Sequence, residues 1–328
     1  METLHCKPGA WAIVLAAGEG TRLRSLTKSP SGSPVPKQFC SLYEGPCLLR
    51  EALNRASSIA EPEQTCVVVA EQHRRWWNPE LHCLPPGNII VQPDNRGTAN
   101  GILLPLLHIL HRDPDARVVL LPSDHLVRQE TILATSLRSA VAQLRWRFDE
   151  ILLLGLTPEE SDPELGYIVP GRSDGQGALT VSRFVEKPSP PQAAELVGVG
   201  ALWNAFIVAA AARSLRLLFD ERIPEVVARM SNAVQSDLAA GDGMHATAQL
   251  YMRLPTLDFS RDILTGQECR LRVLPVPRCG WSDLGTPRRV AEALARSPCP
   301  DIAKRLHSDF VGVSLAAQHE RMRLEAAQ

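Results

Sequence analysis

The chain has 328 residues, of which 45% are hydrophobic, so it can bury a sizeable core in one large α/β domain or in one domain with an appendage. Its 35 basic and 36 acidic residues leave a net charge of −1, which indicates neither a nucleic-acid partner nor a membrane partner. The apolar runs are strand-length rather than the ~20 residues that cross a bilayer, and no cationic segment leads into an apolar signal core. We therefore expect a cytoplasmic protein in which any phosphate site is local.

Short β-rich segments alternate with helical segments through the first half of the chain. Such alternation predicts an α/β fold with a doubly wound, mostly parallel, Rossmann-like sheet and helices on both faces. Ligands of such sheets bind at the carboxyl ends of the strands. The expected strands are 12–16, 65–70, 88–91, 117–121 and 151–156, and the expected helices lie near 47–59, 71–82, 98–111 and 129–147.

After residue 157 the pattern changes to a smaller β-ribbon and helical portion. Segments 166–170 and 179–186 predict paired strands, and 191–253 predicts mostly helix, most clearly at Ala209–Phe219 and Ile223–Ala240. A strand at 270–276 and a helix at about 286–296 follow. We therefore expect one main domain over 1–290, with halves 1–157 and 158–290, and a helical tail over 291–328.

The most informative stretch is AIVLAAGEGTRLRSLTKSPSGSPVPKQF, residues 12–39. Gly18 and Gly20 let the chain turn sharply after a buried strand and bring backbone N–H groups to a ligand. Arg22 would supply a forked cation for phosphate oxygens, and Lys37 a point charge held by Pro36. For the glycines alone, an ordinary strand-to-loop turn is the alternative. The whole arrangement favours a nucleoside triphosphate site.

Two aspartates lie where such a site needs a metal ligand. Asp124, in LLPSDH, ends an apolar strand, and Asp283, in GWSDLG, precedes a glycine turn. Either one alone suits a helix cap or a turn. Together, two carboxylates at one crevice suit Mg²⁺, which bridges nucleotide phosphates and keeps water in its other positions.

Cysteine and histidine indicate no further metal site. The eight cysteines are scattered without a CxxC pair, which disfavours zinc and a disulfide framework. His108 and His111 lie three apart on an expected helix, but no third ligand is near them in the sequence.

The string at 12–39 resembles the signature of the sugar-1-phosphate nucleotidyltransferases, and PKQF at 36–39 resembles its mannose-1-phosphate guanylyltransferase form. The resemblance covers roughly residues 10–290. It implies that Asp124 and Asp283 hold the catalytic Mg²⁺, and that the half at 1–157 binds the nucleotide, with the base read by 94–99. The implied catalytic residues are Arg22, Lys37, Asp124 and Asp283. The implied nucleotide-binding residues are Ala16, Ala17, Gly18, Gly20, Thr21, Arg22, Gly97, Thr98, Ala99 and Asp124.

The half at 158–290 resembles the sugar-phosphate side of that family. Glu186-Lys187 in FVEKP resembles its EKP, where the glutamate holds sugar hydroxyls and the lysine meets the sugar phosphate. Gly166 in GYI resembles the glycine of YGYI, and Asn204 in WN resembles the asparagine of WNSG, both of which meet the sugar. The chain departs from the family at Ala16-Ala17, at Leu165 and at Ala205-Phe206, where a ring replaces a glycine.

The resemblance implies that the phosphate of a sugar 1-phosphate attacks the α-phosphorus of an NTP and expels pyrophosphate. The motifs favour GTP and mannose 1-phosphate, and therefore GDP-mannose as the product. A uridylyl- or thymidylyltransferase acting on another sugar 1-phosphate is one alternative, and a catalytically silent nucleotide-sugar-binding regulatory protein is another. We expect no nucleic-acid or membrane partner, and the oligomeric state, a homo-oligomer included, stays open.

Overall fold

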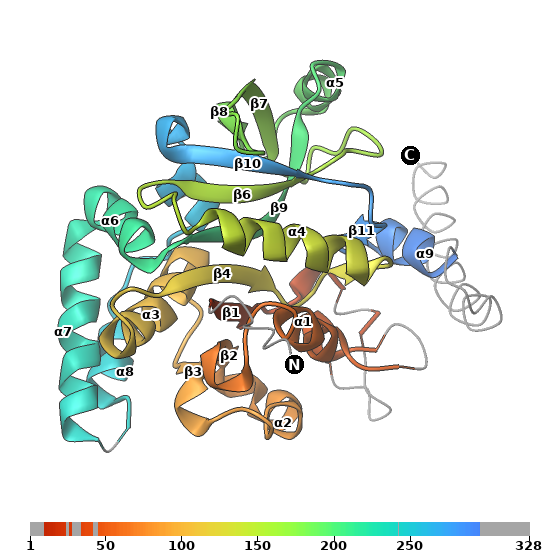
Figure 1. Ribbon diagram of the computed structural model, residues 1–328. Coiled ribbons are helices and arrows are strands. Elements are labelled where there is room, and N and C mark those ends of the chain that lie inside the picture. Colours follow the sequence, from red (N-terminus) through yellow and green to blue (C-terminus); the bar gives the residue numbers. More distant parts are fainter. Residues whose placement is uncertain (1–9, 24–25, 28–33, 42–44, 242, 296–328) are drawn as a thin grey trace, which may run out of the picture.

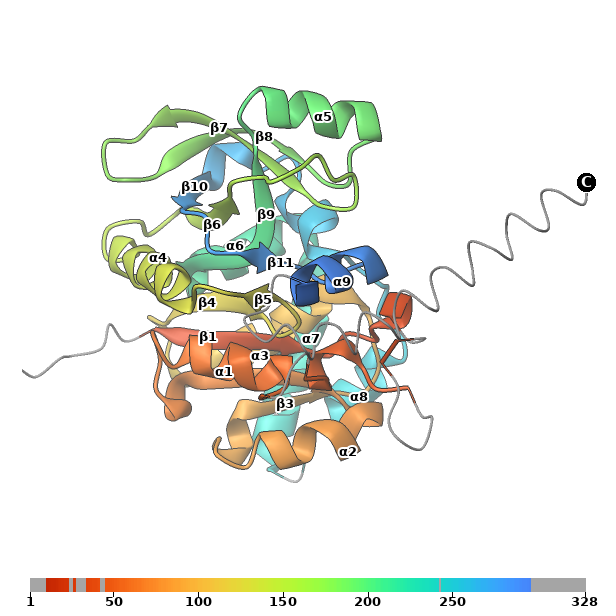
Figure 2. The same ribbon diagram turned by 90° about the vertical axis from the view of Figure 1, so that its right-hand side faces the viewer.

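The structure is a computed structural model that describes residues 10–23, 26–27, 34–41, 45–241 and 243–295 (Figure 1). A nine-stranded sheet with the order β3-β2-β1-β4-β9-β6-β10-β8-β7 forms its centre. The two ends of the sheet differ: α2 lies near β3, whereas α5, β7 and β8 lie together at the opposite end (Figures 1 and 2). Most of the predicted tail at 291–328 falls outside the described residues.

Four parallel strands form the N-terminal part of the sheet, close to the predicted positions. Their alternate side chains enter two different hydrophobic clusters: Ala12 and Val14 lie in one, and Ile13 lies in the other. Both faces of this part are therefore covered. The strands are β1 (Trp11–Ala16), β2 (Thr65–Ala70), β3 (Ile89–Gln92) and β4 (Arg117–Pro122).

The helices lie on the two faces of the sheet in the same way. One cluster takes the buried side chains of α1 (Leu48–Ala56), α4 (Glu130–Gln143) and α5 (Pro190–Gly198), with Trp77 of α2 (Arg74–Trp77). The other takes those of α3 (Gly97–Arg112), α6 (Ala212–Arg222), α7 (Pro224–Ala240) and α8 (His245–Tyr251). Among the described residues, no helix has the length and apolar character needed to cross a membrane.

The second part of the sheet differs from the predicted one. The segment 191–253 is mostly helical, as predicted, in α5, α6, α7 and α8, but it also holds a strand that was not predicted, β9 (Leu202–Ala211). The helix predicted from Ala209 therefore begins only at Ala212. β9 pairs antiparallel with β4 on one side and with β6 (Ile151–Leu156) on the other. The described sheet is therefore mixed, and the prediction of a mostly parallel sheet holds for β1 to β4. Alanine-rich LWNAFIVAAA favours helix by intrinsic propensity, but burial in the middle of the sheet overrides that preference.

The remaining strands complete the sheet and carry the site. β10 (Leu271–Val276) runs parallel to β6 and antiparallel to β8 (Leu179–Val185), which forms the predicted ribbon with β7 (Tyr167–Ser173). A separate two-stranded pairing joins β5 (Leu126–Val127) to β11 (Trp281–Ser282). α9 (Pro287–Ala295) follows β11 and packs with Leu23, Leu48 and Leu126 in a third cluster. α9 is thereby attached beside β5 and β11.

Candidate active site

A cavity of about 660 Å³ opens beside the ends of β1 and β4. Its volume lies within the range of small-molecule sites, which is roughly 300–1,000 Å³. It brings together most of the predicted residues from segments that lie far apart in the sequence. Those that line it are Ala17, Gly18, Arg22, Lys37, Gly97, Thr98, Asp124, Gly166, Glu186, Lys187, Asn204 and Asp283.

Four predicted nucleotide-binding residues do not line this cavity. Ala16 is buried within β1, and Ala99 is fully buried with its N–H donated to the Leu257 carbonyl at 3.0 Å. Gly20 is in the left-handed region, and a Cβ there would lie 3.0 Å from the backbone nitrogen of Lys37, so this glycine lets two loop segments pack closely. Thr21 is exposed outside the cavity.

Lys37 joins the two predicted metal aspartates. Its Nζ lies 2.9 Å from Asp124 Oδ2 and donates to the main-chain oxygen of Asp283 at 2.6 Å. The side chain is 9% exposed. Burial alone would raise the pKa of Asp124, but the Lys37 ammonium outweighs it and holds that pKa below its usual value. Asp124 is therefore a carboxylate at neutral pH.

The pairing of β11 with β5 brings Asp283 to this place. Trp281 Nε1 donates to His125 Nδ1 at 3.2 Å, and the two rings meet edge to face at 5.1 Å. Burial lowers the pKa of His125 to about 4, so the ring is neutral at physiological pH and accepts at Nδ1. This contact between Trp281 and His125 holds Asp283, two residues after Trp281, near Asp124, the residue before His125.

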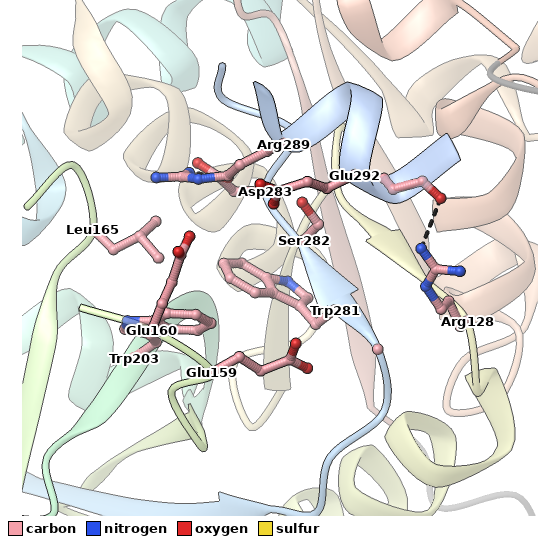
Figure 3. A pocket seen from close by; sticks show the side chains of 12 residues that line it. Arg128, Glu159, Glu160, Leu165, Trp203, Trp281, Ser282, Asp283, Arg289 and Glu292 are labelled. Carbon is pink, nitrogen blue, oxygen red and sulfur yellow. Dashed lines mark hydrogen bonds and ion pairs between the residues drawn. The ribbon is translucent and has the colours of Figure 1, made fainter. Parts of the chain in front are cut away.

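Asp283 carries a second set of partners. Its Oδ1 accepts hydrogen bonds from Arg289 Nη1 and from the Gly285 N–H, the latter at 3.1 Å. Figure 3 shows the Arg289 guanidinium beside the Asp283 carboxylate. Burial would raise the pKa of Asp283, but Arg289 more than offsets it and the pKa lies below its usual value. Both predicted metal ligands are thus ionised and each has a cationic partner.

The donor set fits a magnesium ion that substrate phosphates complete. Asp124 and Asp283 are hard oxygen ligands that line one cavity, and the Asp124 side chain is 40% exposed. Within the described residues no group of three or more His, Cys, Asp or Glu could hold a metal. Mg²⁺ in nucleotide sites takes one or two carboxylates with phosphate and water, so two ligands suffice.

The loop after β1 is held by a residue that the sequence analysis did not single out. Buried Gln38 donates from Nε2 to the carbonyls of Ala16 and Gly18, both at 2.9 Å. Arg22 lies at the cavity edge and pairs with Glu164 at 3.0 Å, with 57% of its side chain exposed. Arg22, the cation predicted to meet phosphate, therefore faces solvent and has an acidic partner from the segment before β7.

A second missed segment, 255–262, links the predicted base-reading turn to Asn204, one of the predicted sugar-side residues. A Cβ on Gly97 would lie 2.2 Å from the Leu257 carbonyl, so the start of α3 needs a glycine there. Thr98 Oγ1 accepts from the Phe259 N–H at 2.8 Å. Ser260, in the π-helical turn Phe259–Leu264, faces Asn204 Nδ2 at 3.5 Å. A sequence motif for this segment is weak, although such turns are frequent at functional sites.

The predicted sugar-side residues lie together. A Cβ on Gly166 would come 2.6 Å from Glu186 Oε2 and 3.3 Å from Asn204 Cβ, so glycine allows these side chains to share one corner. Burial, followed by the neighbouring Asp258, raises the pKa of Glu186. The Glu186 carboxyl group is therefore more basic than an exposed one and suits acceptance of hydrogen bonds from hydroxyl groups.

Three non-glycine residues in the described chain have left-handed backbones: Lys187 (φ 47°), Phe206 (φ 55°) and Leu284 (φ 50°). Lys187 and Phe206 line the cavity, and Leu284 lies between two residues that do. Such strain persists where the surroundings enforce it, and it gathers at functional sites. Phe206 keeps the backbone that a glycine would adopt, and its ring meets Phe259 edge to face at 5.8 Å.

A smaller cavity of about 210 Å³ adjoins the first and shares Leu165, Trp281 and Asp283 with it (Figure 3). The rings of Trp203 and Trp281 lie 6.0 Å apart on its wall. Trp203 belongs to the predicted WN motif, and the structure places its ring in this second cavity, whereas the following Asn204 lines the main one.

Comparison with known proteins now decides the family. The family described as "Nucleotidyl transferase" matches residues 11–297. The chain belongs to the nucleotidyl transferase family. The matched range contains every strand of the described sheet and every residue that lines the main cavity.

Relatives within the nucleotidyl transferase family are moderately similar. "Mannose-1-phosphate guanylyltransferase 2" of Escherichia coli O157:H7 is 26% identical over 89% of this chain and 61% of that protein. "Alginate biosynthesis protein AlgA" of Pseudomonas syringae pv. tomato is 27% identical over 89% of this chain and 60% of that protein. The chain thus spans about three fifths of the length of these relatives.

A solved structure shares the fold. That of a "mannose-1-phosphate geranyltransferase" from Thermus thermophilus matches with a TM-score of 0.74 and 28% identity, over 88% of this chain and 80% of that chain. The mixed α/β architecture of this chain is therefore shared with that protein.

Proposed function

We propose that this chain transfers the nucleotidyl group of a nucleoside triphosphate to a sugar 1-phosphate, with GTP and mannose 1-phosphate as the favoured pair. The observation that carries the proposal is the single cavity that gathers the loop after β1, the two aspartates and the Glu186-Lys187-Asn204 corner. Relatives named mannose-1-phosphate guanylyltransferase support the choice of base and sugar. We assign residues 1–157 to nucleotide binding, as a Rossmann-like half, and 158–290 to the sugar phosphate.

In the proposed reaction an oxygen of the sugar 1-phosphate forms a bond to the α-phosphorus as the bond to pyrophosphate breaks. The second pKa of a phosphate monoester is about 6, so the nucleophile is already largely dianionic near neutrality. No side chain has to remove a proton. The residues of the chain therefore have to align two substrates and offset their charge.

Three cations of the cavity, Arg22, Lys37 and Lys187, have distinct places in that task. Arg22 and Lys37 lie on the proposed nucleotide side, where their present partners are Glu164 and Asp124. On substrate binding each would exchange a carboxylate for phosphate oxygens. Lys187 lies beside Glu186 and would meet the sugar phosphate. Asp124 and Asp283 would hold Mg²⁺, which when bound offsets phosphate charge.

A pyrophosphate-release screen of four NTPs against mannose 1-phosphate and glucose 1-phosphate tests the proposal. We expect the fastest release with GTP and mannose 1-phosphate, and Asp124→Asn is the matched variant that should lose it. Release with UTP or dTTP instead would retain the transferase and overturn the guanylyl assignment. Binding of a nucleotide sugar without release from any pair would favour a silent regulatory protein.

A further inference from the structure

Arg289 is a buried arginine that joins two carboxylates from distant parts of the chain. It lies on α9 with 8% of its surface exposed. Its Nη1 donates to Asp283 Oδ1, and its Nη2 donates to Asp162 Oδ2 (the first pair is drawn in Figure 3). The planar fork of a guanidinium can serve two carboxylates at once, which a lysine ammonium on a flexible stem does less well.

The first carboxylate is a proposed metal ligand. The hydrogen bonds to the Asp283 carboxylate among the described residues, from Arg289 and from the Gly285 N–H, both end on Oδ1. They fix the rotation of the carboxylate and leave Oδ2 as the oxygen available to a cation. Leu284, with its left-handed backbone, lies between the two hydrogen-bonded residues and makes this turn sharp.

The second carboxylate orders the loop that carries the sugar-side glycine. Asp162 Oδ1 accepts the Glu164 N–H at 2.9 Å, and the Asp162 N–H is donated to Tyr167 Oη at 2.7 Å. Leu165 and Gly166, between these anchors, line the main cavity. Arg289 therefore contacts both the proposed metal side and the proposed sugar side through one guanidinium.

Charge makes this contact necessary. The Asp162 and Asp283 side chains are 8% and 16% exposed, so neither carboxylate is well solvated. Two carboxylates that bind the same guanidinium lie close to each other, and without the cation they would repel. Removing one partner of a buried ion pair leaves an uncompensated charge, which displaces the groups that remain.

We infer that Arg289 is a positioning residue for the reaction. It holds Asp283 so that Oδ2 faces the metal, and it keeps the loop 162–167 in place for the sugar phosphate. The inference rests on the proposed function, because it takes Asp283 as a metal ligand. It makes α9 a part of the active site rather than an appendage to it.

The test compares Arg289→Met with Arg288→Met, a matched control on the same helix whose side chain is 63% exposed and pairs with Glu160. Mn²⁺ is titrated alone and followed by electron paramagnetic resonance, and amide exchange is measured in metal-free protein. Loss of an outer-shell partner typically weakens metal binding about 10–100-fold, and we expect that for Arg289→Met. The amides of Glu164 and Gly285 should exchange faster. Arg288→Met should match wild type in both measurements.

Two further variants keep the inference falsifiable. Arg289→Lys retains the positive charge but not the two-pronged guanidinium, so we expect this variant to bind Mn²⁺ more weakly than wild type. Wild-type Mn²⁺ affinity in Arg289→Lys would show that the positive charge alone is sufficient and would overturn the inference. If Arg289→Met does not fold, Asp162→Asn combined with Arg289→Met removes both charges of that pair and should still bind Mn²⁺ weakly. Wild-type Mn²⁺ binding in any folded Arg289→Met protein overturns it.

Failure of the proposed function would be separately visible. A wild-type protein that releases no pyrophosphate from any substrate pair, yet binds Mn²⁺ and loses it in Arg289→Met, contradicts the reaction and supports the positioning role. A wild-type protein that binds no Mn²⁺ contradicts the positioning role.

Discussion

Phe206 offers a test in which glycine should be more stabilising than alanine. Its backbone is left-handed (φ 55°), and its N–H is donated to Asn204 Oδ1 at 3.0 Å, which holds the turn at the cavity wall. Phe206→Ala and Phe206→Gly both remove the half-buried ring. Alanine keeps the strained backbone, and glycine relieves it.

The magnitudes decide the order of the two variants. A left-handed residue with a Cβ costs roughly 1–2 kcal/mol. Glycine in turn lowers the free energy of unfolding by about 0.4–1 kcal/mol relative to alanine, because it gives the unfolded chain more conformational entropy. The free energy of unfolding should therefore be about 1 kcal/mol higher for Phe206→Gly than for Phe206→Ala. Both variants lose the contact with Phe259, worth about 0.5–1.5 kcal/mol for an edge-to-face pair.

Urea unfolding of both variants measures this difference, and the neighbouring Ala205 provides the control. Ala205 is fully buried and, unlike Phe206, is not among the residues with positive φ. Ala205→Gly should lower the free energy of unfolding, by roughly 0.5–1 kcal/mol for glycine within a strand. If Phe206→Ala proved as stable as Phe206→Gly, the reasoning from backbone strain would be refuted.

The remaining predictions address the cavity and the half-buried His108. Asp124→Asn and Asp283→Asn should each lower kcat by at least ~10²–10³ while circular dichroism stays unchanged; near-wild-type turnover would exclude them as metal ligands. Lys187→Ala should raise KM for the sugar 1-phosphate more than for the NTP, and Arg22→Ala should do the reverse; equal shifts in both saturation curves would contradict this division. Burial lowers the pKa of His108 to about 4. The charges of Arg112 and His111 lower this pKa further, and the Asp237 carboxylate opposes them. The folded state then binds fewer protons than the unfolded state, so stability rises with pH from about 4 to about 6.5 and is lost as pH falls. His108→Gln should flatten that slope in urea unfolding at several pH values, and an unchanged slope would contradict the lowered pKa of His108.

Local patterns predicted much of the fold and of the cavity. The strands of the first half, the turn after β1 and the position of Asp124 beside that turn follow from hydrophobic periodicity, glycine and the edge at which parallel strands end. That Asp283 joins Asp124 followed from the resemblance of its segment to the family, not from these local patterns. β9 was missed because its alanines favour helix locally, and its pairing joins residues as far apart in sequence as Arg117 and Ala211. Arg289 was missed for a similar reason, since 127 positions separate it from Asp162. In both cases the deciding contact is a long-range one that no local pattern contains.

The central place of β9 has a consequence for how the chain can be divided and synthesised. In a fragment that ends at residue 157, β4 would lack its neighbour on one side, and β6 would lack both β9 and β10. Unpaired strand edges of this kind promote aggregation. The sheet can be completed only after β10, which ends at Val276, has left the ribosome. Its folding therefore depends on contacts between distant parts of the chain, which are slow to form. Expression of the two halves as separate proteins should therefore yield insoluble material, even where each half carries its own binding residues.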